Sequence, residues 1–161
     1  IGKVLNIEYP EFLDLTFENL AGRSESIQIN SAIFLNDAYN ANPESMKASI
    51  ETFLNQNNEL PQILVIGEMR ELGNYSKEAH YDIGKFCSSF NFQELIVVGD
   101  NAVEIKNAFD DNCKNQTKAT FFSTNKETAE YLKQIITKKV NILLKASRGA
   151  KLEEILAYLK T

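Results

Sequence analysis

The sequence has no tryptophan, one histidine and two cysteines among its 161 residues. Cys87 and Cys113 fit neither a CxxC pair nor a zinc-binding spacing, and one histidine cannot build a multi-histidine metal site. Apolar runs reach only about five residues, far short of the ~20 that a membrane-spanning helix needs. These shortages exclude a disulfide scaffold, a zinc module and a transmembrane helix.

The charge balance is acidic, with a formal net charge of -5. Such a chain is a poor general binder of nucleic acid or of anionic membranes, although a local basic patch can hold a phosphate. The start lacks the charged segment and apolar stretch of a signal peptide, which together with the few cysteines predicts a cytoplasmic protein. Because the chain begins at Ile1 and not at Met, we expect a piece of a longer protein.

Short apolar runs rich in β-branched residues alternate with stretches of helical periodicity. Near-continuous apolar runs are typical of strands covered on both faces of a parallel sheet. The runs lie at residues 32–35, 63–67, 95–99, 119–122 and 140–144, and the helical stretches lie at 46–54, 79–90, 102–109, 129–136 and 152–159. The order predicts an α/β fold, a doubly wound, mostly parallel sheet flanked by helices.

The first residues follow a different pattern. Apolar residues within 12–20 suggest a short helix, and the alternation at 26–29 suggests an edge strand. We expect residues 1–24 to be the tail of a preceding domain and a linker, and residues 25–161 to form one domain.

The familiar phosphate loop, dinucleotide fingerprint and nucleophile elbow are all absent. A dense polar cluster, Asn-Asp-Ala-Tyr-Asn-Ala-Asn-Pro at 36–43, instead follows the first apolar run. Ligands of open α/β sheets bind at the carboxyl ends of the strands, where Asp37 can accept hydrogen bonds from a ribose. The amides of a helix that begins at Pro43 can receive an anion. Asn and Pro are also ordinary turn and cap residues, so the spacing alone leaves both interpretations open.

Five motifs, in order along the chain, resemble the C-terminal domain of the Mur ligases. Residues 37–46, Asp-Ala-Tyr-Asn-Ala-Asn-Pro-Glu-Ser-Met, are similar to the signature that opens that domain. The resemblance is strongest to the branch that adds D-Ala-D-Ala to UDP-N-acetylmuramoyl-tripeptide, and it departs where Asn36 replaces an Asp and Ala146 a Gly. The other four motifs are Gly-Arg-Ser-Glu at 22–25, Gly-Glu-Met-Arg-Glu-Leu-Gly at 67–73 (the family has Gly-Asp-Met-x-Glu-Leu-Gly), Glu-Ala-His at 78–80 with Ile-Gly at 83–84, and Lys-Ala-Ser-Arg-Gly at 145–149.

The resemblance implies an ATP-dependent amide ligase that works through an acyl-phosphate, with ATP, D-Ala-D-Ala and UDP-N-acetylmuramoyl-tripeptide as ligands and Mg²⁺ as cofactor. The family's phosphate loop and most Mg²⁺ ligands belong to a central domain, so we expect a lid that is inactive alone and has no catalytic residue or metal ligand of its own. The N-terminal and central domains would be its partners, with no nucleic acid or membrane. The implied nucleotide contacts are Arg23, Asp37, Tyr39, Asn40 and Asn42. The implied substrate contacts are His80, Lys145, Ser147 and Arg148.

Several residues keep two interpretations. An Arg148 side chain suits bidentate capture of the dipeptide carboxylate, but it also suits a solvated helix entrance. His80 can be a contact to the dipeptide or a surface histidine with its hydrogen bonds satisfied. The charged residues of 68–71 either orient a binding loop or pair with one another, and we favour pairing. Two other functions stay open: a sister amide ligase (another Mur ligase or a folylpolyglutamate synthase) and a stand-alone α/β binding module.

Overall fold

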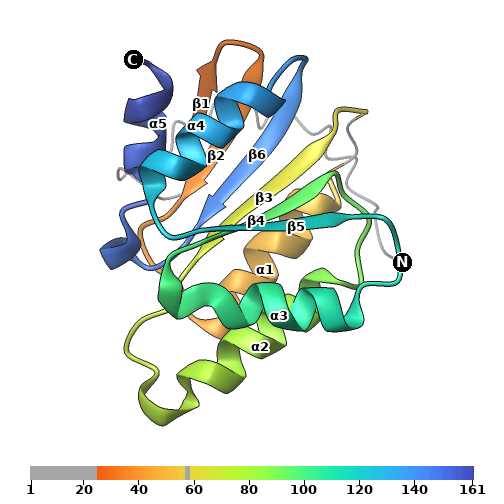
Figure 1. Cartoon of the computed structure of the whole chain (residues 1–161), viewed down its shortest axis with the longest axis vertical. Helices are drawn as coiled ribbons and strands as arrows, with labels where there is room; N and C mark the ends of the chain where they lie inside the picture. Colours follow the sequence, from red (N-terminus) through yellow and green to blue (C-terminus); the bar gives the residue numbers. More distant parts are fainter. Residues whose placement is uncertain (1–24, 57–58) are drawn as a thin grey trace, which may run out of the picture.

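A single mostly parallel sheet organises the computed structural model of the chain, which describes residues 25–56 and 59–161 (Figure 1). Its strands lie in the order β1-β2-β6-β3-β4-β5, and β1 alone pairs antiparallel, with β2. This arrangement confirms the predicted fold, including the edge strand at 26–29, while the helix predicted within 12–20 lies outside the described residues. The strands are β1 (Glu25–Ile29), β2 (Ala32–Asp37), β3 (Gln62–Gly67), β4 (Glu94–Val98), β5 (Lys118–Phe122) and β6 (Val140–Lys145).

Helices cover both faces of the sheet. One face carries α1 (Pro43–Leu54), α2 (Ser76–Cys87) and α3 (Val103–Asn112), and the other carries α4 (Asn125–Ile135) and α5 (Glu153–Leu159) (Figure 1). Three short 3₁₀ turns, η1 (Gly73–Tyr75), η2 (Asp100–Ala102) and η3 (Arg148–Ala150), follow β3, β4 and β6. None of the helices in the described part of the chain is long and apolar enough to cross a membrane.

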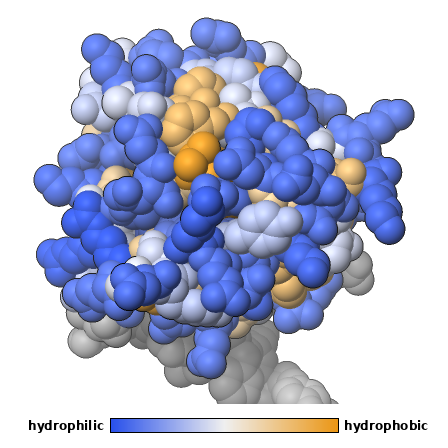
Figure 2. All heavy atoms as spheres, turned by 60° about the horizontal axis from the view of Figure 1, so that its bottom comes forward, coloured by the Kyte–Doolittle hydropathy of each residue, from blue (hydrophilic) through white to orange (hydrophobic). Residues whose placement is uncertain are grey.

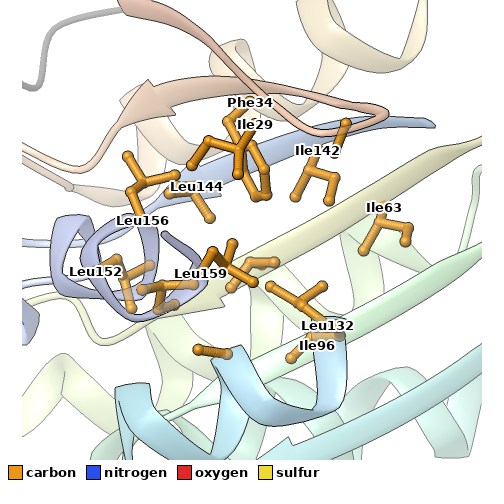
Figure 3. Packing of buried hydrophobic residues seen from close by; sticks show 14 of the residues in the cluster. Ile29, Phe34, Ile63, Ile96, Leu132, Ile142, Leu144, Leu152, Leu156 and Leu159 are labelled. Carbon is orange, nitrogen blue, oxygen red and sulfur yellow. The ribbon is translucent and has the colours of Figure 1, made fainter. Parts of the chain in front are cut away.

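Two hydrophobic clusters hold the layers together. Successive strand residues point to opposite faces, so Leu64 packs beneath α1, α2 and α3 whereas Val65 packs beneath α4 and α5. Figure 3 shows the second cluster, where Phe34 and Ile142 of the sheet face Leu156 and Leu159 of α5. Burial on both faces is why the central strands have unbroken apolar runs. The edge strand β5 differs from this expectation, because residues 119–122 are only half-buried.

Side-chain caps fix the starts of two helices. Asn42 accepts a hydrogen bond from the Ser45 amide (2.8 Å), Ser45 Oγ in turn accepts from the Asn42 amide (3.0 Å), and Pro43 opens α1. Thr124 and Glu127 form the equivalent capping box at α4. Both caps confirm the sequence signals, and each fixes the residue at which its helix begins.

The position of β6 brings three loops together at one end of the sheet. β6 is the last strand in the sequence, but it lies between β2 and β3. The three loops that follow β2, β3 and β6 therefore emerge side by side at the carboxyl edge. We call the loops at residues 38–42, 68–72 and 146–151 the mouth.

Candidate functional site

Ser147 joins the three loops of the mouth. Its amide donates to the Glu68 carbonyl (2.9 Å), and its hydroxyl accepts from the Arg70 amide (2.9 Å) and donates to the Ala41 carbonyl (3.3 Å). The residue is only 6% exposed, so these bonds are shielded from water. Ser147, expected as a substrate contact, thus holds the mouth in one arrangement.

Lys145 joins β6 to the loop after β2 from inside the protein. The side chain is 3% exposed, and Nζ lies 3.1 Å from Asp37 Oδ2. It also donates to the carbonyls of Asp37 (3.2 Å) and Asn40 (2.5 Å). A buried ammonium needs this full set of acceptors to offset the loss of hydration. Lys145 therefore has internal partners for its charge.

Asp37 keeps one carboxylate oxygen toward the mouth. Both Lys145 and the Ser49 hydroxyl (2.9 Å) bind Oδ2. Within residues 25–56 and 59–161, Oδ1 has no hydrogen-bond partner, and the side chain is 20% exposed. An anchored carboxylate with one available oxygen can accept hydrogen bonds from ligand hydroxyls.

Arg148 lies against Tyr39 at the outer side of the mouth. Its guanidinium carbon is 5.1 Å from the Tyr39 ring centroid, and Nη1 donates to the phenol oxygen (3.3 Å). The stacking orients an exposed guanidinium without neutralising it, because the ring carries no net charge. The side chains of Asn40 and Asn42 form hydrogen bonds within the protein. Asn40 Oδ1 accepts from the backbone amide of Ala41 (2.9 Å), and the Asn42 side chain caps α1.

Arg70 and Glu68 form an ion pair in the loop after β3, which confirms the pairing expected from sequence. Arg70 Nε lies 2.5 Å from Glu68 Oε1, and Asn101 Nδ2 donates to Oε2 (2.6 Å). Burial alone would raise the pKa of Glu68. The hydrogen bonds from Asn101 and Arg70, together with nearby positive charge, outweigh it and hold this pKa below its usual value.

His80 lies beneath the same loop and is fully buried. The Met69 amide donates to Nε2 (2.9 Å), and Nδ1 lies 2.7 Å from the Ser76 carbonyl, so these partners place the proton on Nδ1. The hydrogen bonds of His80 are satisfied, as one interpretation expected, but the ring is buried and not at the surface. The contact to the dipeptide stays a prediction. In the structure His80 binds the backbone amide of Met69 and so holds the loop after β3.

The structure thus brings together seven of the nine expected contacts, all except His80 and Arg23, which lies outside the described residues. Two side chains that position this group were not singled out from sequence: Ser49 and Asn101. The sequence could have indicated Asn101. Gly67-Glu68 follows the core of β3 much as Gly99-Asp100 follows β4, and the ends of neighbouring parallel strands lie at the same edge of a sheet. The face brought forward in Figure 2, at the lower end of Figure 1, is mostly hydrophilic.

A doubly wound sheet with polar loops at the carboxyl ends of its strands is the architecture of an α/β domain, a class in which ligands generally bind at that edge. Residues 22–148 match the family described as Mur ligase, glutamate ligase domain. The chain belongs to this family.

Two similar curated proteins carry the name UDP-N-acetylmuramoyl-tripeptide–D-alanyl-D-alanine ligase. The protein of Buchnera aphidicola (subsp. Acyrthosiphon pisum) is 35% identical over 83% of this chain and 28% of its own length. That of Rickettsia prowazekii is 30% identical over 98% of this chain and 34% of its own. The chain thus spans about a third of the length of these relatives.

Solved structures agree with this assignment. A MurF from Acinetobacter baumannii has a TM-score of 0.73 at 29% identity and covers 86% of this chain and 30% of its own. MurF ligase from Thermotoga maritima in complex with ADP has a TM-score of 0.71 at 25% identity, over 88% of this chain and 31% of its own.

Proposed function

We propose that this chain is the C-terminal domain of an ATP-dependent ligase that adds D-Ala-D-Ala to UDP-N-acetylmuramoyl-tripeptide in the synthesis of peptidoglycan precursors. The observation that carries the proposal is the mouth, in which Lys145 and Ser147 fix the signature loop against the loops of β3 and β6. Residues 25–161 would be the domain and 1–24 the connection to a central domain. The similarity to curated ligases of that name supports the substrate class.

In the proposed reaction the acceptor carboxylate attacks the γ-phosphorus of ATP, which releases ADP and forms an acyl-phosphate. The dipeptide amine then attacks the acyl carbon, and phosphate leaves as the amide forms. Asp37 would accept from the nucleotide ribose through Oδ1, with Arg23 beside the phosphates. Arg148, oriented by Tyr39, would bind the dipeptide carboxylate. Closure of the domain would exclude water, which otherwise hydrolyses the acyl-phosphate.

Mg²⁺ accompanies ATP in this proposal. The described residues contain no group of three or more His, Cys, Asp or Glu side chains that could hold a metal ion. We therefore assign its ligands to the central domain, together with the phosphate loop that this sequence lacks. The share of this chain is to bind, orient and enclose the ligands, and the 161-residue chain alone should not turn over ATP.

The test is ATP-dependent joining of D-Ala-D-Ala to UDP-N-acetylmuramoyl-tripeptide by the full-length ligase that carries this chain. Arg148→Gln and Asp37→Asn should each lower kcat/KM by about tenfold or more, which is ~1.4 kcal/mol of transition-state stabilisation. Lys77→Gln is the matched control, because Lys77 is 80% exposed on α2 and, among the residues that the structure describes, forms an ion pair only with Glu104.

Three outcomes would change the proposal. Joining of a single amino acid in place of D-Ala-D-Ala would keep the fold and the family but replace the substrate. Wild-type rates in both mouth variants, with normal thermal stability, would refute the assigned roles of Asp37 and Arg148. Turnover of ATP by the 161-residue chain alone would refute the division of labour between domains.

A further inference from the structure

Arg70 is a cation of the mouth with a role that the proposed reaction leaves unassigned. It occupies the variable position of the Gly-Glu-Met-Arg-Glu-Leu-Gly motif, just after β3. Its amide is fixed by Ser147 Oγ (2.9 Å), so the residue is attached to the same serine that joins the three loops. The side chain is 56% exposed, which leaves the guanidinium accessible from the solvent.

The guanidinium is nevertheless oriented by the protein. Glu68 holds it through Nε, and Asn101 holds the other oxygen of that carboxylate. The far end of the side chain lies over Gly149, where an added methyl group would be 2.0 Å from Arg70 Nη1. The absence of a side chain at Gly149 is thus what admits the guanidinium to this place.

The terminal nitrogens remain available. Within the part of the chain that the structure describes, the guanidinium is hydrogen-bonded through Nε alone. The Nη1 and Nη2 groups present donors in a planar fork, the geometry that matches a carboxylate or phosphate. Arg148 belongs to the same η3 turn as Gly149, so two oriented guanidiniums flank one turn of the mouth.

We propose that Arg70, cradled by Glu68 and Gly149, binds an oxyanion of a substrate at the mouth. The oxyanion is either the carboxylate of the incoming amine donor or a phosphate of the nucleotide. The identity of these substrates rests on the proposed function, whereas the presence of an oxyanion site at Arg70 does not. Arg70 is in either case a substrate-contacting residue that the family motif leaves variable.

Titration of the 161-residue chain tests the site itself. Backbone amide signals of Arg70 and Gly149 are followed by NMR while D-Ala-D-Ala or inorganic phosphate is added. At least one probe should give a saturable shift, with a Kd that rises about tenfold in Arg70→Gln. Gly149→Ala should weaken binding similarly, because it keeps the charge but displaces the guanidinium. The Lys77→Gln control should bind as wild type does.

Kinetics of the full-length ligase identify the oxyanion. Carboxylate binding predicts that Arg70→Gln raises the KM for D-Ala-D-Ala about tenfold, leaves the KM for ATP unchanged and reduces the preference for D-Ala-D-Ala over its C-terminal amide. Phosphate binding predicts the opposite pattern, a raised KM for ATP alone. If the ligase joins no D-Ala-D-Ala, the proposed function fails while the titration still decides on Arg70.

Three results would overturn the proposal. One is the absence of a saturable shift with either probe. Another is equal weakening in Arg70→Gln and Lys77→Gln, which would mean a general effect of charge. The third is wild-type binding by Gly149→Ala, which would mean that the cradle does not position the guanidinium.

Discussion

Replacing Lys145 by methionine should destabilise the domain strongly, although the two side chains are similar in length. Methionine cannot donate, so three acceptors lose the donor that Nζ supplies: the Asp37 carboxylate and the carbonyls of Asp37 and Asn40. The site lies inside the protein, where Lys145 itself is 2% exposed. Removal of one member of a buried pair leaves the other charge uncompensated, and the remaining charge dominates the cost.

The expected loss in the free energy of unfolding follows from the polar groups that are left without a donor. Loss of a buried pair partner costs about 3–5 kcal/mol, and a buried carbonyl without a donor adds about 1–3 kcal/mol. The Asp37 side chain is 20% exposed and keeps the Ser49 hydroxyl, so water can reach part of the vacated site. We therefore expect about 3 kcal/mol, the low end of the range, which lowers Tm by roughly 6–12 °C in a domain of this size.

Urea denaturation of the 161-residue chain, followed by circular dichroism, measures this change. The exposed Lys77, which is 3.4 Å from Glu104, is the control, and Lys77→Met should cost under about 1 kcal/mol. The substitution Lys145→Met should cost less in an Asp37→Asn background than in wild type, with a coupling of about 1–3 kcal/mol. A loss below about 1 kcal/mol for Lys145→Met, or zero coupling, would refute the buried pair as the element that fixes the loop.

Three further outcomes are expected. Burial raises the pKa of Cys87 to about 12, so at pH 8 a thiol reagent should modify only Cys113 in the native chain and both thiols in denaturant; two rapidly reacting native thiols would contradict this. Because the pKa of folded Glu68 lies below its usual 4.5, its contribution to stability is present above that pH and is lost as the pH falls through the folded value. The excess stability of wild type over Glu68→Gln should therefore shrink on acidification, and a constant difference would argue against the assigned hydrogen bonds. His80→Leu leaves the buried Met69 amide without its acceptor, which should cost about 1–3 kcal/mol and speed hydrogen exchange at that amide; unchanged exchange there would show that the ring does not hold that loop.

Patterns of burial and capping predicted most of the fold, because they act locally. Each central strand is covered on both faces, so its apolar run is visible without knowledge of its neighbours. The caps at Asn42 and Thr124 use residues within one turn of the helix, and both are present in the structure. The order of the strands could not be predicted from local patterns. Insertion of β6 between β2 and β3 depends on contacts between segments about a hundred residues apart.

The same limit applies to the site. Motif resemblance placed Lys145, Ser147 and Arg148 together as substrate contacts, since all three follow one strand. Their depths differ sharply in the structure, because Lys145 and Ser147 are buried and Arg148 is exposed. Depth depends on the neighbouring loops, which a single sequence does not specify. Ala146 illustrates the same point: its methyl group is buried against Gly67, where a Cβ would be 2.8 Å away.

The buried and the exposed cations of the mouth have different roles. Lys145 uses its donors within the protein, where Nζ connects β6 to Asp37 and to the Asn40 carbonyl of the loop after β2. Tyr39 orients the guanidinium of Arg148, and Glu68 orients that of Arg70. Both arginines keep further donors that are accessible from the solvent. Guanidiniums that are oriented before binding lose little freedom when a ligand arrives, so more of the interaction energy contributes to affinity. An incoming substrate should therefore meet a preformed surface on this domain, and closure onto the rest of the enzyme would complete the site.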